Sequence, residues 1–174
     1  MLALGASCGA GAQSEALADR LRAGGCAVLL RHGRTTPGVG DPPGFRLDSC
    51  GTQRNLSEEG QAQCRAIGQW FRKLRLQPGA VRSSAWCRCR DTARLAFGAH
   101  ETWLPLNSTF GASADAAAAT QALRAALSRI PTGAFEVWVT HQVNVTALTG
   151  EFTEMGEGLV IDAAARTVAR SRFA

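Results

Sequence analysis

Two kinds of hydrophobic pattern alternate along the chain. Short continuous apolar runs are typical of strands buried on both faces, whereas apolar residues that recur every three or four positions indicate one face of a helix. Runs of the first kind predict strands over residues 26–30, 80–83, 135–140, 158–162 and 167–170. Recurrence of the second kind predicts helices over residues 14–23, 58–75, 88–97 and 115–130.

Capping and loop residues agree with this division. Ser57 is a predicted N-cap, and Glu58 and Glu59 follow it at the positive end of the helix. Residues 35–50 are rich in Gly, Pro and Asp and are expected to form a loop. Because strands alternate with helices, the sequence favours an α/β fold, a three-layer sandwich with a mostly parallel central sheet, in a single domain over residues 14–174.

The charge pattern favours an anionic substrate. The 174-residue chain has a formal net charge of +5, and because Lys73 is its one lysine, arginine supplies nearly all of the positive charge. The planar guanidinium group offers a fork of donors that matches a phosphate group. The basic residues are not clustered as a nucleic-acid interface would require, so no nucleic-acid partner is expected.

The cysteines and the N-terminus favour export. Six cysteines without a CxxC pair argue against a zinc site, and this many cysteines is typical of an oxidising compartment. Residues 1–13 are small and apolar, and Ala10-Gly11-Ala12 resembles a signal-peptidase site. We expect residues 1–13 to be a signal-peptide remnant or a disordered N-terminus. The protein is then periplasmic or otherwise exported, with a cytoplasmic location as the alternative, and no segment approaches the roughly 20 apolar residues that span a membrane.

Three segments carry residues suited to phosphate chemistry. Arg31-His32-Gly33 follows one predicted buried strand, and His141 follows another. Between them lies a Ser-Ser-x-x-x-Arg-x-x-x-Thr-Ala segment that contains Arg88. The order of these segments, together with the helix opening at residues 55–62, resembles the histidine phosphatase superfamily, also called phosphoglycerate-mutase-like. The resemblance extends from about residue 28 to residue 162 and implies the phosphoglycerate mutase-like fold.

The resemblance assigns a role to each of these residues. It implies that His32 is a covalent nucleophile, that Arg31 and Arg88 grip the phosphate oxygens, and that His141 stabilises the transferring group. The chemistry agrees, because a neutral imidazole can attack phosphorus and the remaining work is positioning and electrostatic stabilisation. The pocket then needs no metal and no other cofactor. Two further residues fall where the family often has substrate-binding neighbours, Arg34 and Asn55.

The general acid is left open by the sequence. Acid-phosphatase relatives place an aspartate directly after the second histidine, where this chain has Gln142. Mutase-like relatives use a glutamate well after the second-segment arginine, and the acids in that stretch are Glu101 and Asp115. Glu157, before a predicted strand, is the third possible general acid. Ser84 is interpreted as an N-cap, since no GxSxG elbow surrounds it.

A disulfide is predicted between Cys50 and Cys87. Cys50 lies in the loop before the first long helix, and Cys87 immediately precedes Arg88, so both segments should border the phosphate pocket that the resemblance implies. Cys89 is the rival partner, but on a helix that begins near Arg88 it should point away from Cys87. A bridge between Cys50 and Cys87 would hold Arg88 and the flanking loop in place.

The sequence therefore predicts a metal-independent phosphatase that hydrolyses a phosphate monoester through a phosphohistidine on His32. Its partner would be a phosphorylated small molecule or an envelope component. A mutase is disfavoured, since the chain lacks the long insertions of the glycolytic enzymes. Two alternatives stay open: a phosphohistidine-protein phosphatase, whose good leaving group needs no evident acid, and a non-catalytic phosphate-binding protein of the envelope.

Overall fold

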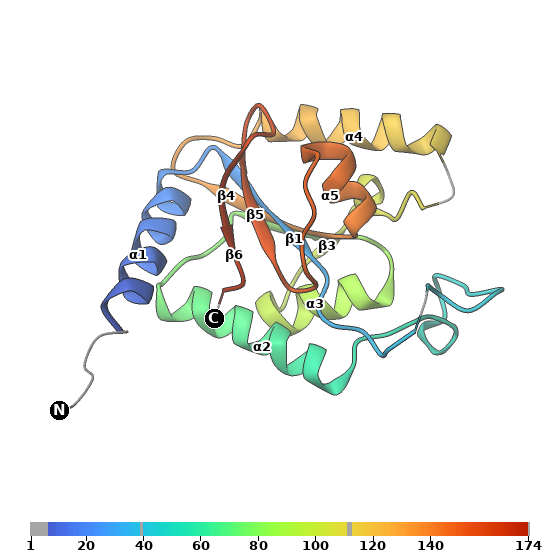
Figure 1. Cartoon of the computed structure of the whole chain (residues 1–174). Coiled ribbons are helices and arrows are strands. Elements are labelled where there is room, and N and C mark those ends of the chain that lie inside the picture. The colour runs from blue at the N-terminus through green and yellow to red at the C-terminus, as the bar shows by residue number, and fades with distance from the viewer. Residues whose placement is uncertain (1–6, 39, 111–112, 174) are drawn as a thin grey trace.

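A six-stranded sheet with helices on both faces forms the predicted three-layer α/β arrangement (Figure 1). The structure is a computed structural model that describes residues 7–38, 40–110 and 113–173, with the backbone alone for residues 7–10 and 113–115. The strand order is β3-β2-β4-β1-β5-β6. The strands are β1 (Cys26–Arg31), β2 (Ala80–Ser83), β3 (Glu101–Thr102), β4 (Phe135–Thr140), β5 (Gly158–Asp162) and β6 (Thr167–Ser171).

The sheet is mixed, which corrects the prediction of a mostly parallel one. Strands β1 to β4 pair in parallel, whereas β5 pairs antiparallel with β1, and β6 pairs antiparallel with β5. Residues 163–166 alone connect β5 to β6, and so short a connection can join only antiparallel neighbours. The prediction of parallel strands is therefore correct only for the part of the sheet formed by β1 to β4.

In the part of the chain that the structure describes, five helices and two short 3-10 turns surround the sheet. On one face lie α2 and α3, and on the other lie α4 and α5 (Figure 1). The helix α1 shares a hydrophobic core with α2 and α3. The bounds are α1 (Ser7–Ala23), α2 (Glu58–Lys73), α3 (Cys87–Phe97), α4 (Ser113–Leu127) and α5 (Gln142–Thr149), with 3-10 turns η1 (Cys50–Thr52) and η2 (Leu104–Leu106).

Strand β1 lies at the centre of both cores. Its side chains alternate, so that Cys26, Val28 and Leu30 face the core under α2 and α3. Ala27 and Leu29 face the core under α4 and α5. All five are fully buried, which explains why the strand reads as one continuous apolar run.

Helices α1 and α5 differ most from their sequence predictions, whereas α2, α3 and α4 begin and end within three residues of theirs. Helix α1 begins at Ser7 instead of Ser14, because the small residues before Ser14 include no proline to stop it. Residues 1–6 of the predicted signal-peptide remnant lie outside the described residues. Helix α5 was not predicted, since its β-branched residues favour strands, but Val145 and Leu148 pack it onto the sheet. None of the helices described is both long and apolar enough to cross a membrane.

Candidate active site

The two predicted catalytic histidines lie side by side because β1 and β4 are parallel neighbours. Arg31 at the end of β1 pairs with Thr140 at the end of β4, so the next residue of each strand is a histidine. The backbone N–H of His32 donates to the carbonyl of Thr140 at 3.0 Å. The rings of His32 and His141 meet edge to face, with centroids 5.5 Å apart. This is the edge of the sheet where open α/β folds place their ligands.

The ring of His32 is held neutral, with one nitrogen fixed. Its Nδ1 lies 2.8 Å from the carbonyl oxygen of Gly33, and because that oxygen only accepts, Nδ1 carries the proton. The lone pair is therefore on Nε2. Burial lowers the pKa of His32 to about 3; the bond to Gly33 opposes this shift, and the positive charges of Arg88, Arg31 and Arg54 add to it. At neutral pH the imidazole is uncharged and can act as a nucleophile.

Two glycines let the chain pack closely beside this histidine. A Cβ atom on Gly33 would lie 2.5 Å from the Sγ of Cys64 and 3.1 Å from the carbonyl of Gly60. A Cβ atom on Gly60 would collide with the backbone carbonyl of Arg34. Glycine at both positions therefore lets the first turns of α2 lie against the segment that follows His32.

Both histidines line a cavity of about 430 Å³. Three arginines line the same cavity: Arg31, Arg54 and Arg88. The Nε atom of each is buried and lacks a hydrogen-bond partner among the described residues. Arg31 is anchored by bonds from Nη1 to the carbonyl of Thr153 (2.6 Å) and to Oε1 of Gln142 (3.3 Å). Buried donors without partners are costly, and an anion in the cavity would satisfy them.

Arg54 is a site residue that the sequence reasoning missed. It lies in the connection between η1 and α2, where its Nη1 donates to the carbonyl of Gly38 at 2.9 Å. Burial lowers its pKa first, and repulsion from Arg88 adds to that effect. Burial is also the largest cause that lowers the pKa of Arg31, and the positive charge of Arg54 is the second. The only signal in the sequence was an arginine beside the recognised Asn55, and such a residue is more often solvated.

His141 is neutral in the free protein. Burial is the largest cause that lowers its pKa well below the usual value, followed by electrostatic coupling to the titration of His32 and by the positive charges of Arg88 and the other arginines. Its Nε2 lies 2.8 Å from the hydroxyl of Ser84, and its Nδ1 lies 3.4 Å from Nη2 of Arg88. Because Arg88 can only donate, Nδ1 accepts and Nε2 carries the proton. Ser84 is therefore a partner of His141, while Trp86 occupies the N-cap position of α3.

Asp41 is an unpredicted carboxylate of the cavity. Its Oδ1 accepts from Nη1 of Arg88 at 2.8 Å and from the backbone of Arg54 at 3.0 Å, and its Oδ2 accepts from Nε1 of Trp86 at 3.1 Å. Burial would raise the pKa of Asp41, but these bonds and the charge of Arg88 outweigh burial and lower the pKa. The side chain is therefore an ionised clamp on Arg88.

Two of the three predicted general acids, Glu101 and Glu157, are not among the residues that line this cavity. Glu101 is exposed on the edge strand β3 and pairs with Arg82 at 3.5 Å. Glu157 is buried, but its carboxylate accepts from the backbone of Glu154 at 2.8 Å and pairs with Arg170 at 3.4 Å, and it is not among the residues that line the cavity. The side chain of Asp115 lies outside the described residues. Gln142, at the position of the acid-phosphatase aspartate, anchors Arg31 instead.

The two predicted substrate-binding neighbours lie outside the histidine cavity. Arg34 is exposed and lines an adjoining cavity of about 630 Å³, which shares Arg31 with the first. Asn55 donates from Nδ2 to the carbonyl of Cys50 at 2.6 Å, so it braces the loop. Within residues 7–38, 40–110 and 113–173, no group of three or more His, Cys, Asp and Glu residues is arranged to hold a metal ion.

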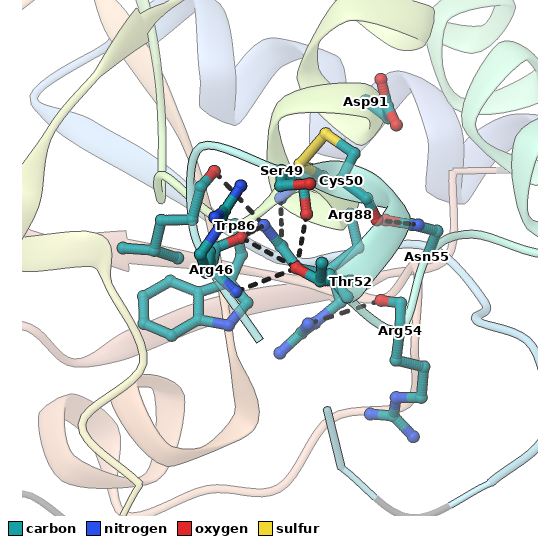
Figure 2. Close-up of a disulfide and its surroundings, with 12 residues drawn as sticks. Arg46, Ser49, Cys50, Thr52, Arg54, Asn55, Trp86, Arg88 and Asp91 are labelled. Atoms are coloured by element: carbon teal, nitrogen blue, oxygen red, sulfur yellow. Dashed lines mark hydrogen bonds between the residues drawn. A yellow bond between two sulfur atoms is a disulfide. The ribbon is translucent and has the colours of Figure 1, made fainter. Parts of the chain in front are cut away.

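The predicted disulfide between Cys50 and Cys87 is present in the structure, with Cα atoms 5.7 Å apart (Figure 2). Cys87 is the first residue of α3, directly before Arg88. In Figure 2 the guanidinium of Arg88 extends toward the carbonyl of Arg54, on the segment that follows Cys50. The bridge therefore ties the loop that carries Asp41 and Arg54 to the helix that carries Arg88. Cys89 is free and buried, and its Sγ lies 3.5 Å from Nε2 of His141.

Comparisons with known proteins agree with this geometry. Residues 27–110 match the profile of the Histidine phosphatase superfamily (branch 1). This match covers slightly less than half of the chain, and the resemblance supports a phosphatase enzyme. A comparison with curated proteins gave no match.

Two solved structures share the fold. The protein histidine phosphatase SixA, complexed with tungstate, superposes with a TM-score of 0.57 at 14% identity, over 83% of this chain and 95% of its own. The protein TTHB049 from Thermus thermophilus superposes with a TM-score of 0.58 at 21% identity, over 83% and 98%. At these identities the likeness establishes the fold alone.

Proposed function

We propose that the protein hydrolyses a phosphate monoester through a phosphohistidine on Nε2 of His32. The observation that carries this proposal is a neutral, buried His32 with its Nε2 lone pair free, beside three arginines whose Nε atoms lack partners. In the first step a bond forms from Nε2 to phosphorus while the bond from phosphorus to the leaving oxygen breaks, and that oxygen keeps the electron pair and takes a proton from solvent. In the second step water attacks the phosphohistidine, the electron pair of the broken bond returns to Nε2, and inorganic phosphate leaves.

The surrounding residues supply positioning and positive charge. The carbonyl of Gly33 keeps the proton on Nδ1 and stabilises the positive charge that the ring acquires on phosphorylation. Arg31, Arg54 and Arg88 bind the phosphoryl oxygens through charge-assisted hydrogen bonds. His141 lies in contact with Arg88, and a bound phosphate dianion would raise its pKa so that it can donate to the phosphoryl group.

A second candidate is the dephosphorylation of phosphohistidine on a protein. It is favoured because Asp41, the acid that the described residues place in the cavity, is held ionised by Arg88. Phosphohistidine has a leaving group that can depart without a strong acid, and the fold is shared with SixA, a protein histidine phosphatase. A third candidate, a phosphate-binding protein without turnover, retains the same pocket.

The protein is further proposed to act outside the cytoplasm, on a phosphorylated small molecule or envelope component. The Cys50–Cys87 bridge supports this location, because such bridges persist mainly in oxidising compartments.

Trapping of the intermediate tests the mechanism. The wild-type protein is incubated with p-nitrophenyl phosphate and quenched, and acid-labile phosphate is mapped by mass spectrometry. His32→Ala should abolish turnover and labelling while the circular dichroism spectrum is unchanged. Near-wild-type turnover of His32→Ala would refute the covalent role, and binding of phosphate without any turnover by the wild-type protein would favour the third candidate.

A further inference from the structure

Aromatic side chains surround the mouth of the histidine cavity. Trp86 forms one wall, with its ring 5.3 Å from the ring of His141 and 5.8 Å from that of Phe45. The bond from its Nε1 to Asp41 fixes the plane of the indole. Phe45 and Phe110 line the same cavity, and they are 36% and 85% exposed. The cavity therefore has a cationic floor and an aromatic mouth.

The direction of phosphoryl transfer places the leaving group in this mouth. His32 is 3% exposed, so it lies at the floor of the cavity. The attacking and leaving atoms are roughly in line on opposite sides of phosphorus. A phosphoryl group seated between His32 and the arginines must therefore direct its leaving oxygen toward Phe45, Trp86 and Phe110. These rings would therefore contact the leaving group.

Among the described side chains that line this cavity, none is an acid suited to protonate a poor leaving group. Asp41 is bonded to Arg88 at 2.8 Å and to Trp86 at 3.1 Å, so both of its oxygens are occupied as acceptors. General acid catalysis typically contributes about 10²–10⁴-fold to such a step. A substrate with a phenolic leaving group, whose pKa is about 10, needs this help far less than an alkyl ester.

We propose that the leaving group is a phenol, so that the substrate is a small aryl phosphate. This inference rests on the proposed phosphatase function and adds the substrate class. Phenolate departs toward the mouth with the electron pair of the P–O bond, its ring against Trp86 and Phe45, and takes a proton from solvent. A cavity of about 430 Å³ fits a small-molecule substrate.

Three phosphate esters distinguish recognition of the aromatic ring from the effect of a phenolic leaving group. Phenyl phosphate has a ring and a phenolic leaving group, benzyl phosphate has a ring but an alkoxide leaving group, and ethyl phosphate has neither. We expect kcat for benzyl phosphate to fall by about 10²-fold or more relative to phenyl phosphate, because no acid assists it. We expect KM for benzyl phosphate to be about threefold to tenfold below that for ethyl phosphate, because its ring contacts the aromatic mouth.

Phe45→Ala removes one aromatic ring from the mouth of the cavity and leaves His32 and the arginines unchanged. It should raise KM for phenyl phosphate by about threefold to tenfold and leave the inhibition constant of inorganic phosphate unchanged. The matched control is Leu47→Ala, in the same loop and 37% exposed, which is not among the residues lining the cavity and should leave KM unchanged.

Equal kcat/KM for phenyl and ethyl phosphate, or an unchanged KM in Phe45→Ala, would overturn the aryl assignment while leaving the phosphatase proposal intact. Preferential hydrolysis of phosphoramidate, which has no ring, would likewise overturn the aryl assignment and favour the phosphohistidine alternative. Absence of turnover and of a phosphoenzyme with every ester would refute the phosphatase proposal itself.

Discussion

Acidification should destabilise the protein through His32. Its pKa is 6.5 in an unfolded chain and about 3 in the fold, so the unfolded state binds the proton more tightly. Stability is therefore greatest above pH 6.5, falls as the pH drops from 6.5 towards 3, and levels off below that. At about 1.36 kcal/mol per pKa unit, protonation of His32 in the unfolded state lowers the free energy of unfolding by about 2 kcal/mol between pH 7.5 and pH 5. The full decrease, reached below pH 3, is about 5 kcal/mol.

The comparison of wild-type protein with His32→Asn isolates this contribution. Free energies of unfolding are measured in urea at pH 7.5 and pH 5, with the disulfide intact. The wild-type protein should lose about 2 kcal/mol more than His32→Asn, whose side chain does not titrate. His141→Asn should also lose less free energy of unfolding than the wild-type protein between pH 7.5 and pH 5, since burial also lowers the pKa of His141. Equal losses in wild-type protein and His32→Asn would refute the claim that His32 is buried in its neutral form.

Four further outcomes are expected. Replacing Cys50 and Cys87 together by serine should lower the free energy of unfolding by about 4 kcal/mol in urea melts, because the bridge closes a loop with a sequence separation of 37. Arg54→Ala should weaken inhibition by inorganic phosphate about tenfold to hundredfold through the loss of charged hydrogen bonds, and an unchanged inhibition constant would remove this residue from the site. Glu157→Gln should retain kcat within about twofold, because Arg170 and not substrate contacts the carboxylate, whereas a loss of about 10²-fold would restore it as the acid. Activity should survive EDTA, since the arginines supply the positive charge; loss of activity that one divalent ion restores would contradict this.

The two candidate catalytic histidines could be placed from the sequence because each follows a strong local signal. A continuous apolar run predicts β1 and another predicts β4, and His32 and His141 follow them directly. Parallel pairing of such strands brings their carboxyl ends together without further information. The disulfide was also predictable, since Cys87 adjoins Arg88 and the loop that holds Cys50 was expected to border the same phosphate pocket.

Asp41 and Arg54 could not be placed in this way. Both lie in irregular segments, where no hydrophobic period relates sequence position to a point in space. Their positions are set by contacts with distant residues, namely the bond between Asp41 and Arg88 and the bridge at Cys50. The mixed edge of the sheet escaped prediction for a different reason, because apolar runs do not specify strand direction.

The pocket concentrates positive charge that the free protein neutralises only in part. Arg88 has a carboxylate partner in Asp41, whereas burial lowers the pKa of Arg31 and Arg54 and neighbouring arginines lower it further. Such an arrangement is unfavourable without an anion, so the fold must hold the charges together. Strand β1 fixes Arg31 and helix α3 fixes Arg88, but Arg54 lies on a loop that the Cys50–Cys87 bridge ties to α3. The bridge thus helps to keep Arg54 near Arg88, and an anion bound between the guanidinium groups would relieve their mutual repulsion.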